Sequence, residues 1–279
     1  MNSKAQFIIV AALLIGIMVT SLAVSIYLTA TQHQEFRYQA YKEIIINIDK
    51  DFKRALARIL ALATYEYGQN EVKDRLEEVL SKGDTNGYDI KADFNEKLSY
   101  WCQTLIQSYP DAGLQLSLKD EENLLECLWL SSKSFSVIYS ELTVNLISYG
   151  LYGFVSEGRI QLNVTIDRVS AKRKGNSITI SLEFHVEREY GEPVSSLSKD
   201  NYNKFTGQDT LAGWAISYNQ TENWIQPEEV NIEYSAGGKY TITFEVPKKP
   251  SGKLSFYLVL RVRDERGILV VALANVREE

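Results

Sequence analysis

Residues 7–28 read FIIVAALLIGIMVTSLAVSIYL, and this apolar run lies inside a longer stretch, Ala5 to Gln34, that contains no Asp, Glu, Lys or Arg. About 20 apolar residues in a helix, each rising about 1.5 Å, cross the hydrocarbon layer of a bilayer. The run therefore predicts a transmembrane helix. The rest of the chain, from Glu35 onwards, is polar enough to be soluble, so we expect one membrane helix that holds a large ectodomain.

The residues that flank this run predict its orientation. Lys4 and the α-amino group precede it, and positive charge near a membrane end favours the cytoplasmic side. We therefore expect a single-pass protein of the cell membrane with a cytoplasmic N-terminus and extracellular C-terminal domains. The alternative is a cleaved secretory signal, for which Thr29-Ala30-Thr31 offers a weak cleavage site.

Two kinds of residue bear on an extracellular location. Asn163-Val164-Thr165 and Asn219-Gln220-Thr221 are N-glycosylation sequons, which makes Asn163 and Asn219 the candidate glycosylation sites. Cys102 and Cys127 are the only cysteines, and in an oxidising compartment they are expected to form a disulfide. Two buried free thiols are an equally weighted alternative. The two histidines lie far from both cysteines, so no metal site is expected.

The apolar run continues into a long amphipathic pattern. No Gly occurs between Gly16 and Gly68, no Pro occurs before Pro110, and apolar residues recur every three or four positions from Phe36 to Tyr67. The sequence therefore predicts a first segment, 1–34, made of a cytoplasmic tail and the transmembrane helix. It also predicts an unbroken continuation of this helix over 35–67, with one stripe that must be buried.

Helices and then strands follow along the chain. We expect further helices at 70–82 and 90–109, and then strands that include the strict alternation of Ile160, Leu162, Val164 and Ile166 with polar residues. Helices followed by strands favour an α+β domain over 35–170, in which an antiparallel sheet lies on the long helix.

The basic stretch at 171–175 predicts a boundary, beyond which short alternating strands predict an all-β sandwich over 171–279. Within this last part, Gly191-Glu192-Pro193-Val194 and Gly238-Lys239-Tyr240-Thr241-Ile242 resemble stretches of immunoglobulin-like and fibronectin-like surface modules. The resemblance implies an immunoglobulin-like β-sandwich in which Tyr240 is a corner tyrosine.

The N-terminus carries a second resemblance. Ser3-Lys4-Ala5-Gln6-Phe7-Ile8-Ile9-Val10 resembles an archaeal class III signal of type IV pilin-like proteins. The resemblance implies processing at Lys4, Ala5 and Gln6, with the cut between Ala5 and Gln6 and the helix retained. The chain departs from the bacterial pattern at Val10, where bacterial pilins keep a Glu.

The motifs of common catalytic sites are absent from the sequence. There is no GxSxG elbow and no glycine-rich phosphate loop, so we expect no enzyme activity and no cofactor. The net charge is −6 without a basic stripe, which argues against nucleic acid as a partner. Trp214 and Trp224 flank the loop that bears Asn219, and such aromatics stack on sugars or, more often, anchor their own loop.

Three functions remain open. The leading hypothesis is a non-enzymatic, membrane-anchored cell-surface protein that makes structural or adhesive contacts. The alternative is a type IV pilin-like filament subunit, and the second alternative is an extracellular sensor that acts through a membrane partner. The expected partners are the lipid bilayer, other surface or pilin-like proteins, and glycans.

Overall fold

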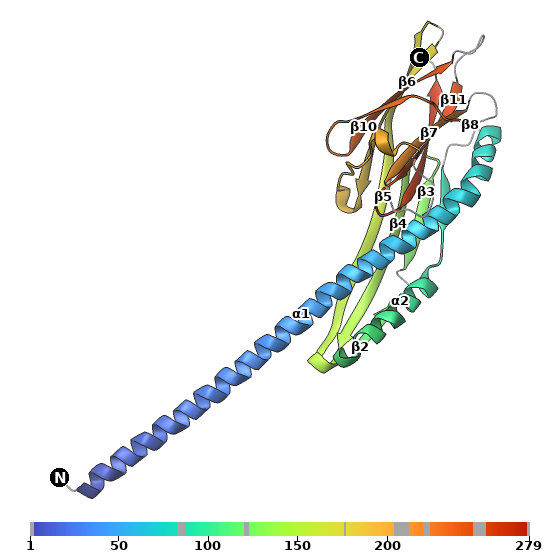
Figure 1. Ribbon diagram of the computed structural model, residues 1–279. Helices are drawn as coiled ribbons and strands as arrows, with labels where there is room; N and C mark the ends of the chain where they lie inside the picture. The colour runs from blue at the N-terminus through green and yellow to red at the C-terminus, as the bar shows by residue number, and fades with distance from the viewer. Residues whose placement is uncertain are drawn as a thin grey trace.

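The structure is a computed structural model, which describes the backbone at residues 3–82, 87–119, 123–175, 177–203, 212–219, 224–247 and 255–277. In the first of these ranges the side chains are described for residues 13–29 and for most positions from 41 onwards. The chain folds into an elongated head, and one long helix extends far beyond this head (Figure 1).

The long helix is a single element, α1 (Ser3–Lys82), of 80 residues. It joins the predicted N-terminal helix to the predicted helices at 35–67 and 70–82 without a break. No proline interrupts it, and Gly68 is accommodated inside it because its missing side chain makes room for Leu269. The predicted continuity is confirmed, and the expected break before residue 70 is wrong.

The prediction of a membrane-spanning helix is corrected. Within the ranges that the structure describes, no helix is both long enough and apolar enough to span a membrane. This finding overturns the predicted transmembrane anchor and the predicted single-pass location in the cell membrane.

Within the described part of the chain, eight strands form a first sheet, and all of its strand pairs are antiparallel. Its order is β1-β3-β4-β5-β6-β10-β9, and β2 pairs with β4 beside this path. The strands are β1 (Tyr88–Lys91), β2 (Leu114–Leu118), β3 (Leu124–Trp129), β4 (Lys133–Leu146), β5 (Leu151–Lys174), β6 (Ser177–Arg188), β9 (Val230–Tyr234) and β10 (Lys239–Pro247).

Four further strands of the described ranges form a second antiparallel sheet in the order β12-β11-β7-β8. They are β7 (Gly213–Asn219), β8 (Trp224–Ile225), β11 (Ser255–Arg263) and β12 (Leu269–Arg277). The other helices among the described residues are α2 (Asn95–Ser108) and the short 3₁₀ turns η1 (Pro110–Ala112), η3 (Ile147–Tyr149), η4 (Glu189–Gly191) and η5 (Lys199–Asn201). The predicted helix at 90–109 therefore begins later than expected, because Tyr88–Lys91 pairs with β3 and buries Ile90 against Cys127.

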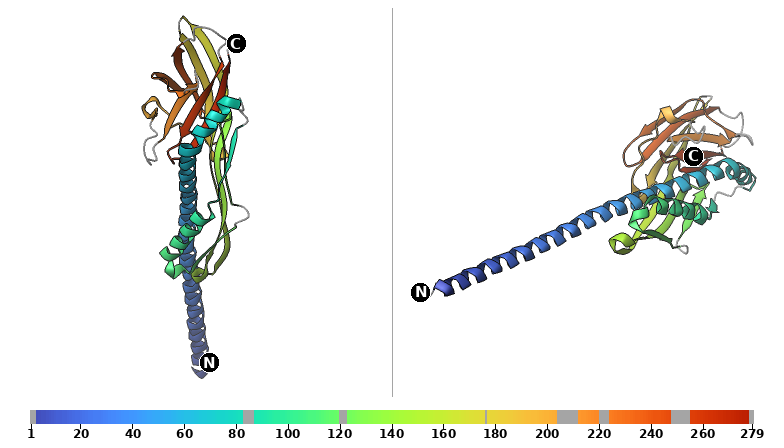
Figure 2. Two further views of the ribbon diagram at one scale, coloured as in Figure 1. Left: turned by 90° about the vertical axis from the view of Figure 1, so that its right-hand side faces the viewer. Right: turned by 60° about the horizontal axis from the view of Figure 1, so that its bottom comes forward.

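One face of the large sheet is covered by two different layers (Figures 1 and 2). Towards one end α1 and α2 pack on this face, and towards the other end the second sheet packs on it. Phe244 of β10 faces Tyr218 of β7 with ring centroids 6.2 Å apart, which places the two sheets face to face. The fold is therefore α+β with antiparallel sheets, as the sequence predicts.

The predicted boundary at 171–175 lies at the turn between β5 and β6. These two strands pair from Leu162↔Arg188 to Lys174↔Ser177, so one continuous sheet crosses the predicted boundary. The strands on both sides also share one buried face, with Val164 opposite Val186.

Close packing joins α1 to the large sheet. Phe52 and Leu56 of α1 are fully buried and lie against Gly158 of β5, where an added Cβ would stand only 2.9 Å from Phe52 Cε1. Ser156 Oγ also donates a hydrogen bond of 2.7 Å to Asp49 Oδ1. The absence of a side chain at Gly158 therefore permits the close approach of the helix.

A hydroxyl of α1 caps the start of β12. Thr64 Oγ1 is fully buried, donates to the Leu60 carbonyl at 2.9 Å and accepts the Leu269 N–H at 3.2 Å. Ser136 Oγ donates to the Leu269 carbonyl at 2.8 Å. Both backbone groups of Leu269 are thus satisfied by side chains, which connects the helix to both sheets.

Candidate functional site

A conspicuous surface lies on the part of α1 outside the head, where the structure describes the side chains of residues 13–29. Its large apolar side chains are between 52% and 74% exposed. They are Leu13, Leu14, Ile15, Ile17, Met18, Val19, Leu22, Val24, Ile26, Tyr27 and Leu28. We call residues 13–29 the apolar stalk.

The apolar stalk differs from the docked part of the same helix. In the docked part, burial is restricted to one stripe that includes Ile48, Phe52, Leu56 and Leu60, and charged residues such as Lys53 lie on other sides. In the stalk, consecutive residues such as Leu13, Leu14 and Ile15 are all apolar, so every side of the helix is apolar. A helix that is apolar all round is normally surrounded on all sides.

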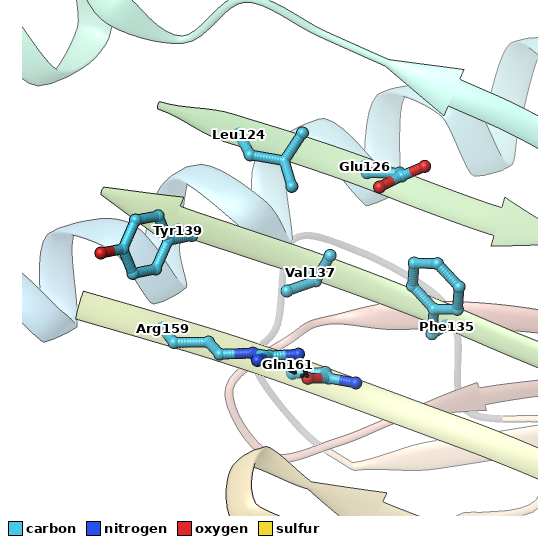
Figure 3. Close-up of a pocket in the computed structure, with 7 residues that line it drawn as sticks. All are labelled: Leu124, Glu126, Phe135, Val137, Tyr139, Arg159 and Gln161. Atoms are coloured by element: carbon cyan, nitrogen blue, oxygen red, sulfur yellow. Dashed lines mark hydrogen bonds between the residues drawn. The ribbon is translucent and has the colours of Figure 1, made fainter. Parts of the chain in front are cut away.

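A second candidate surface is a hollow of about 530 Å³ on the large sheet, on the face turned away from α1 (Figure 3). The strand register places Leu124, Tyr139 and Arg159 in one row across β3, β4 and β5. Glu126, Val137 and Gln161 form the next row, and Phe135 lies beyond them. We call this hollow the outer groove.

Polar side chains along β5 form one edge of the outer groove. Arg159 donates from Nε and Nη2 to Gln161 Oε1 at 3.1 and 2.8 Å, and Gln161 Nε2 donates in turn to Asn163 Oδ1. This chain of hydrogen bonds holds three long side chains in a row along the strand.

A half-buried ion cluster fixes the backbone of β5 at the same place. The Glu189 carboxylate accepts the Gln161 N–H at 3.1 Å, and Arg266 Nη2 donates to the Gln161 carbonyl at 2.9 Å. Arg266 also binds both Glu189, at 2.8 Å, and the fully buried Asp264, at 2.7 Å. The pairing of β5 with β6 stops at Leu162 opposite Arg188. Beyond this point the side chains of Glu189 and Arg266 take the place of a neighbouring strand and bind the backbone N–H and carbonyl of Gln161.

The same cluster shifts the ionisation of its members. Burial alone would raise the pKa of Glu189, but the hydrogen bonds and the charge of Arg266 hold this pKa below its ordinary value. Burial likewise opposes the charge of Arg266, and yet Asp264 and Glu189 raise the pKa of its guanidinium. The carboxylate of Glu189 and the guanidinium of Arg266 are therefore both ionised at neutral pH.

The predicted disulfide is wrong. Cys102 lies on the buried side of α2 and Cys127 on the inner face of β3, and both are free thiols. Burial raises the pKa of Cys102 to about 11 and that of Cys127 to about 12. Both side chains serve as core residues, as in the alternative that the sequence left open.

The other predicted site residues do not converge on one place. Asn163 is half-buried on β5 beside the outer groove, and Asn219 ends β7. The residues that complete the second sequon, Gln220 and Thr221, lie outside the described residues. The same is true of the side chains of Lys4, Ala5 and Gln6.

The tryptophans near the second sequon contribute to the core. Trp214 is fully buried, and its Nε1 donates to the Ser198 carbonyl at 2.7 Å. Trp224 is half-buried. The interpretation in which these rings anchor their own loop fits this placement better than sugar stacking does.

Comparisons of the chain with protein-family models, with curated proteins and with solved structures gave no match. The functional proposals therefore depend on the geometry of the apolar stalk and the outer groove.

Proposed function

We propose that this chain is a non-enzymatic structural subunit that assembles into a type IV pilin-like filament through its apolar stalk. The observation that carries the proposal is the exposure of apolar side chains on every side of α1 over residues 13–29. Exposed apolar area of this extent is unfavourable in water by about 25 cal/mol per Å². Association that surrounds the stalk removes this cost.

The geometry of the stalk favours many copies over two. A partner helix covers only one stripe of its neighbour, as the docked part of α1 illustrates within the head. A helix that is apolar all round needs several neighbours, which a bundle of stalks from many copies provides. The heads, which begin to cover α1 near Ile45, would then lie around the bundle.

The resemblance of Ser3–Val10 to a class III signal supports the same function, because that signal belongs to proteins whose helix is retained after processing. We also infer that β6, β9 and β10 form an immunoglobulin-like β-sandwich with the second sheet. The packing of Phe244 of β10 on Tyr218 of β7, with ring centroids 6.2 Å apart, supports this finer assignment; Tyr240 Oη donates to the Val194 carbonyl, 46 positions upstream, which is not the local bond of a corner tyrosine.

Electron microscopy of the purified full-length protein tests the assembly. We expect the wild type to form filaments and Leu22→Asp to abolish them, because an unpaired carboxylate inside a helix bundle costs several kcal/mol. The matched control, Leu22→Met, keeps the site apolar and should still assemble. Leu22 lies well before the docked part of α1, so the unfolding temperature of the head should be the same in all three proteins.

Filaments formed equally well by Leu22→Asp would contradict the assignment of the stalk as the assembly surface. A wild type that remains monomeric at high concentration would contradict the filament itself.

A further inference from the structure

The outer groove has the chemistry of a ligand site that the proposed filament does not require. Its floor is Val137 of β4, which is only 7% exposed, while Leu124 at its margin is 41% exposed. Its volume of about 530 Å³ falls in the range of small-molecule sites.

Two aromatic rings lie on β4 at either end of the groove. Figure 3 looks onto the sheet and shows the rings of Tyr139 and Phe135 with a face, not an edge, towards the open side. They are four residues apart on one strand, which corresponds to about 14 Å at 3.4 Å per residue. Such a spacing suits an elongated ligand with more than one flat apolar face.

Hydrogen-bonding groups flank these rings on both neighbouring strands. On β5, Arg159 uses two of its five N–H donors in hydrogen bonds to Gln161, and Gln161 uses one of its two amide N–H donors in a hydrogen bond to Asn163. On β3, the Glu126 carboxylate is directly opposite Val137 and supplies acceptors. Because the three side chains on β5 already hold one another, little conformational entropy remains to be lost when they bind a ligand.

We propose that the outer groove binds a neutral oligosaccharide. A sugar ring has an apolar C–H face that stacks on an aromatic ring, and its hydroxyls both donate and accept hydrogen bonds. The groove supplies the aromatic faces on β4, donors on β5 and a carboxylate acceptor on β3. The lining carries one carboxylate, Glu126, which also lies 3.8 Å from Lys91 Nζ on β1, and one guanidinium, Arg159; because neither sign of charge dominates the lining, it favours a neutral ligand.

An added peptide strand fits the groove poorly. At the groove β4 is an interior strand, and although β6 pairs with β5 only from Leu162 onwards, the backbone N–H and carbonyl of Gln161 are already bound by Glu189 and Arg266. Addition of a strand requires an open sheet edge. A ligand that binds through side chains alone, as a sugar does, matches an interior position.

Calorimetric titration of the full-length protein with cellotriose, maltotriose and mannotriose tests the proposal. At least one of these neutral trisaccharides should bind the wild type. Tyr139→Ala should weaken that binding about tenfold through loss of stacking, and Gln161→Leu should weaken it by a similar factor through loss of hydrogen bonds.

Two control variants make the result specific. Tyr139→Phe retains the ring and should bind nearly as well as the wild type. Tyr152→Ala removes a tyrosine that is 66% exposed but lies outside the groove, and it should leave the affinity unchanged. The far-ultraviolet circular dichroism and the unfolding temperature of each variant verify that it is folded.

The proposal is overturned if none of the three sugars binds, or if Tyr139→Ala and Gln161→Leu bind them as tightly as the wild type. It is also overturned if Tyr139→Ala breaks filaments while the wild type binds no sugar, because the groove is then a contact between copies. The groove lies on the face away from α1, so sugar binding should persist in Leu22→Asp and is tested independently of assembly.

Discussion

Single residues decide how closely the head packs on α1. At Gly158 an added methyl group would collide with Leu56 and lie 2.9 Å from a ring carbon of Phe52. Both neighbours are fully buried on α1, so neither has open space into which it can move. A glycine is therefore required at position 158, because only a residue without a side chain lets α1 approach β5 this closely.

We predict that Gly158→Ala destabilises the head by about 1–3 kcal/mol, because overpacking forces side chains or the backbone to shift. Chemical denaturation followed by circular dichroism measures the change. Gly16→Ala is the matched control, since nothing lies within 4 Å of an added Cβ there. An equal stability of Gly158→Ala and the wild type would show that α1 does not pack on β5 as described.

The ion cluster around Glu189 predicts a dependence of stability on pH. The pKa of Glu189 in the folded protein lies below its ordinary value of 4.5, because Arg266 stabilises the carboxylate. The carboxylate therefore contributes its full stabilisation above about pH 4.5, and this stabilisation is lost as the pH falls through the folded-state pKa.

We expect Glu189→Gln to be less stable than the wild type at pH 7, by about 1.5–3 kcal/mol for a charged hydrogen-bond partner. The difference should shrink as the pH falls below about 4.5. Unfolding temperatures of both proteins between pH 3 and pH 7 give this comparison. A difference that is constant over the whole range would mean that the charge of Glu189 does not stabilise the fold.

At the scale of elements, a regular apolar period in the sequence correctly predicts helices and strands, whereas the places where elements end or shift register are not predicted. The apolar recurrence from Phe36 to Tyr67 correctly predicts a continuous helix with one buried stripe. The alternation from Ile160 to Ile166 correctly predicts a strand, but the register between β5 and β6 shifts between Ile166 and Arg168. The basic, glycine-containing stretch at 171–175 predicts a domain boundary, but β5 continues to Lys174 and the stretch is the turn into β6.

The two candidate surfaces differ in how far the sequence reveals them. The apolar stalk is visible as an uncharged run, although its predicted role as a membrane-spanning helix is wrong. The outer groove is not visible, because Glu126, Val137 and Gln161 are brought into one row only by the pairing of three strands. Nor did the sequence reveal that Glu189 and Arg266, 77 positions apart, meet at 2.8 Å.

At the scale of the whole molecule, α1 has two different roles along its length. From Ile45 to Leu76 its apolar stripe is part of the core of the head. Over the apolar stalk the same helix leaves apolar side chains exposed on every side, and Figure 2 shows it standing clear of both sheets in two further views. This division is the basis of the proposed filament, in which the stalks form the centre and the heads lie outside.

Disulfide cross-linking between stalks tests this central proposal most directly. Met18, Leu22 and Ile26 lie four residues apart, and each is replaced in turn by Cys in the full-length protein. The native thiols Cys102 and Cys127 are buried and have raised pKa values, so they should contribute little background. Arg54→Cys is the control, because Arg54 is 77% exposed on the docked part of α1.

After mild oxidation we predict disulfide-linked dimers at one or more stalk positions and far fewer at position 54. A stalk in which all three introduced thiols remain free and fully alkylated, in a protein that sediments as a monomer, would contradict the proposal.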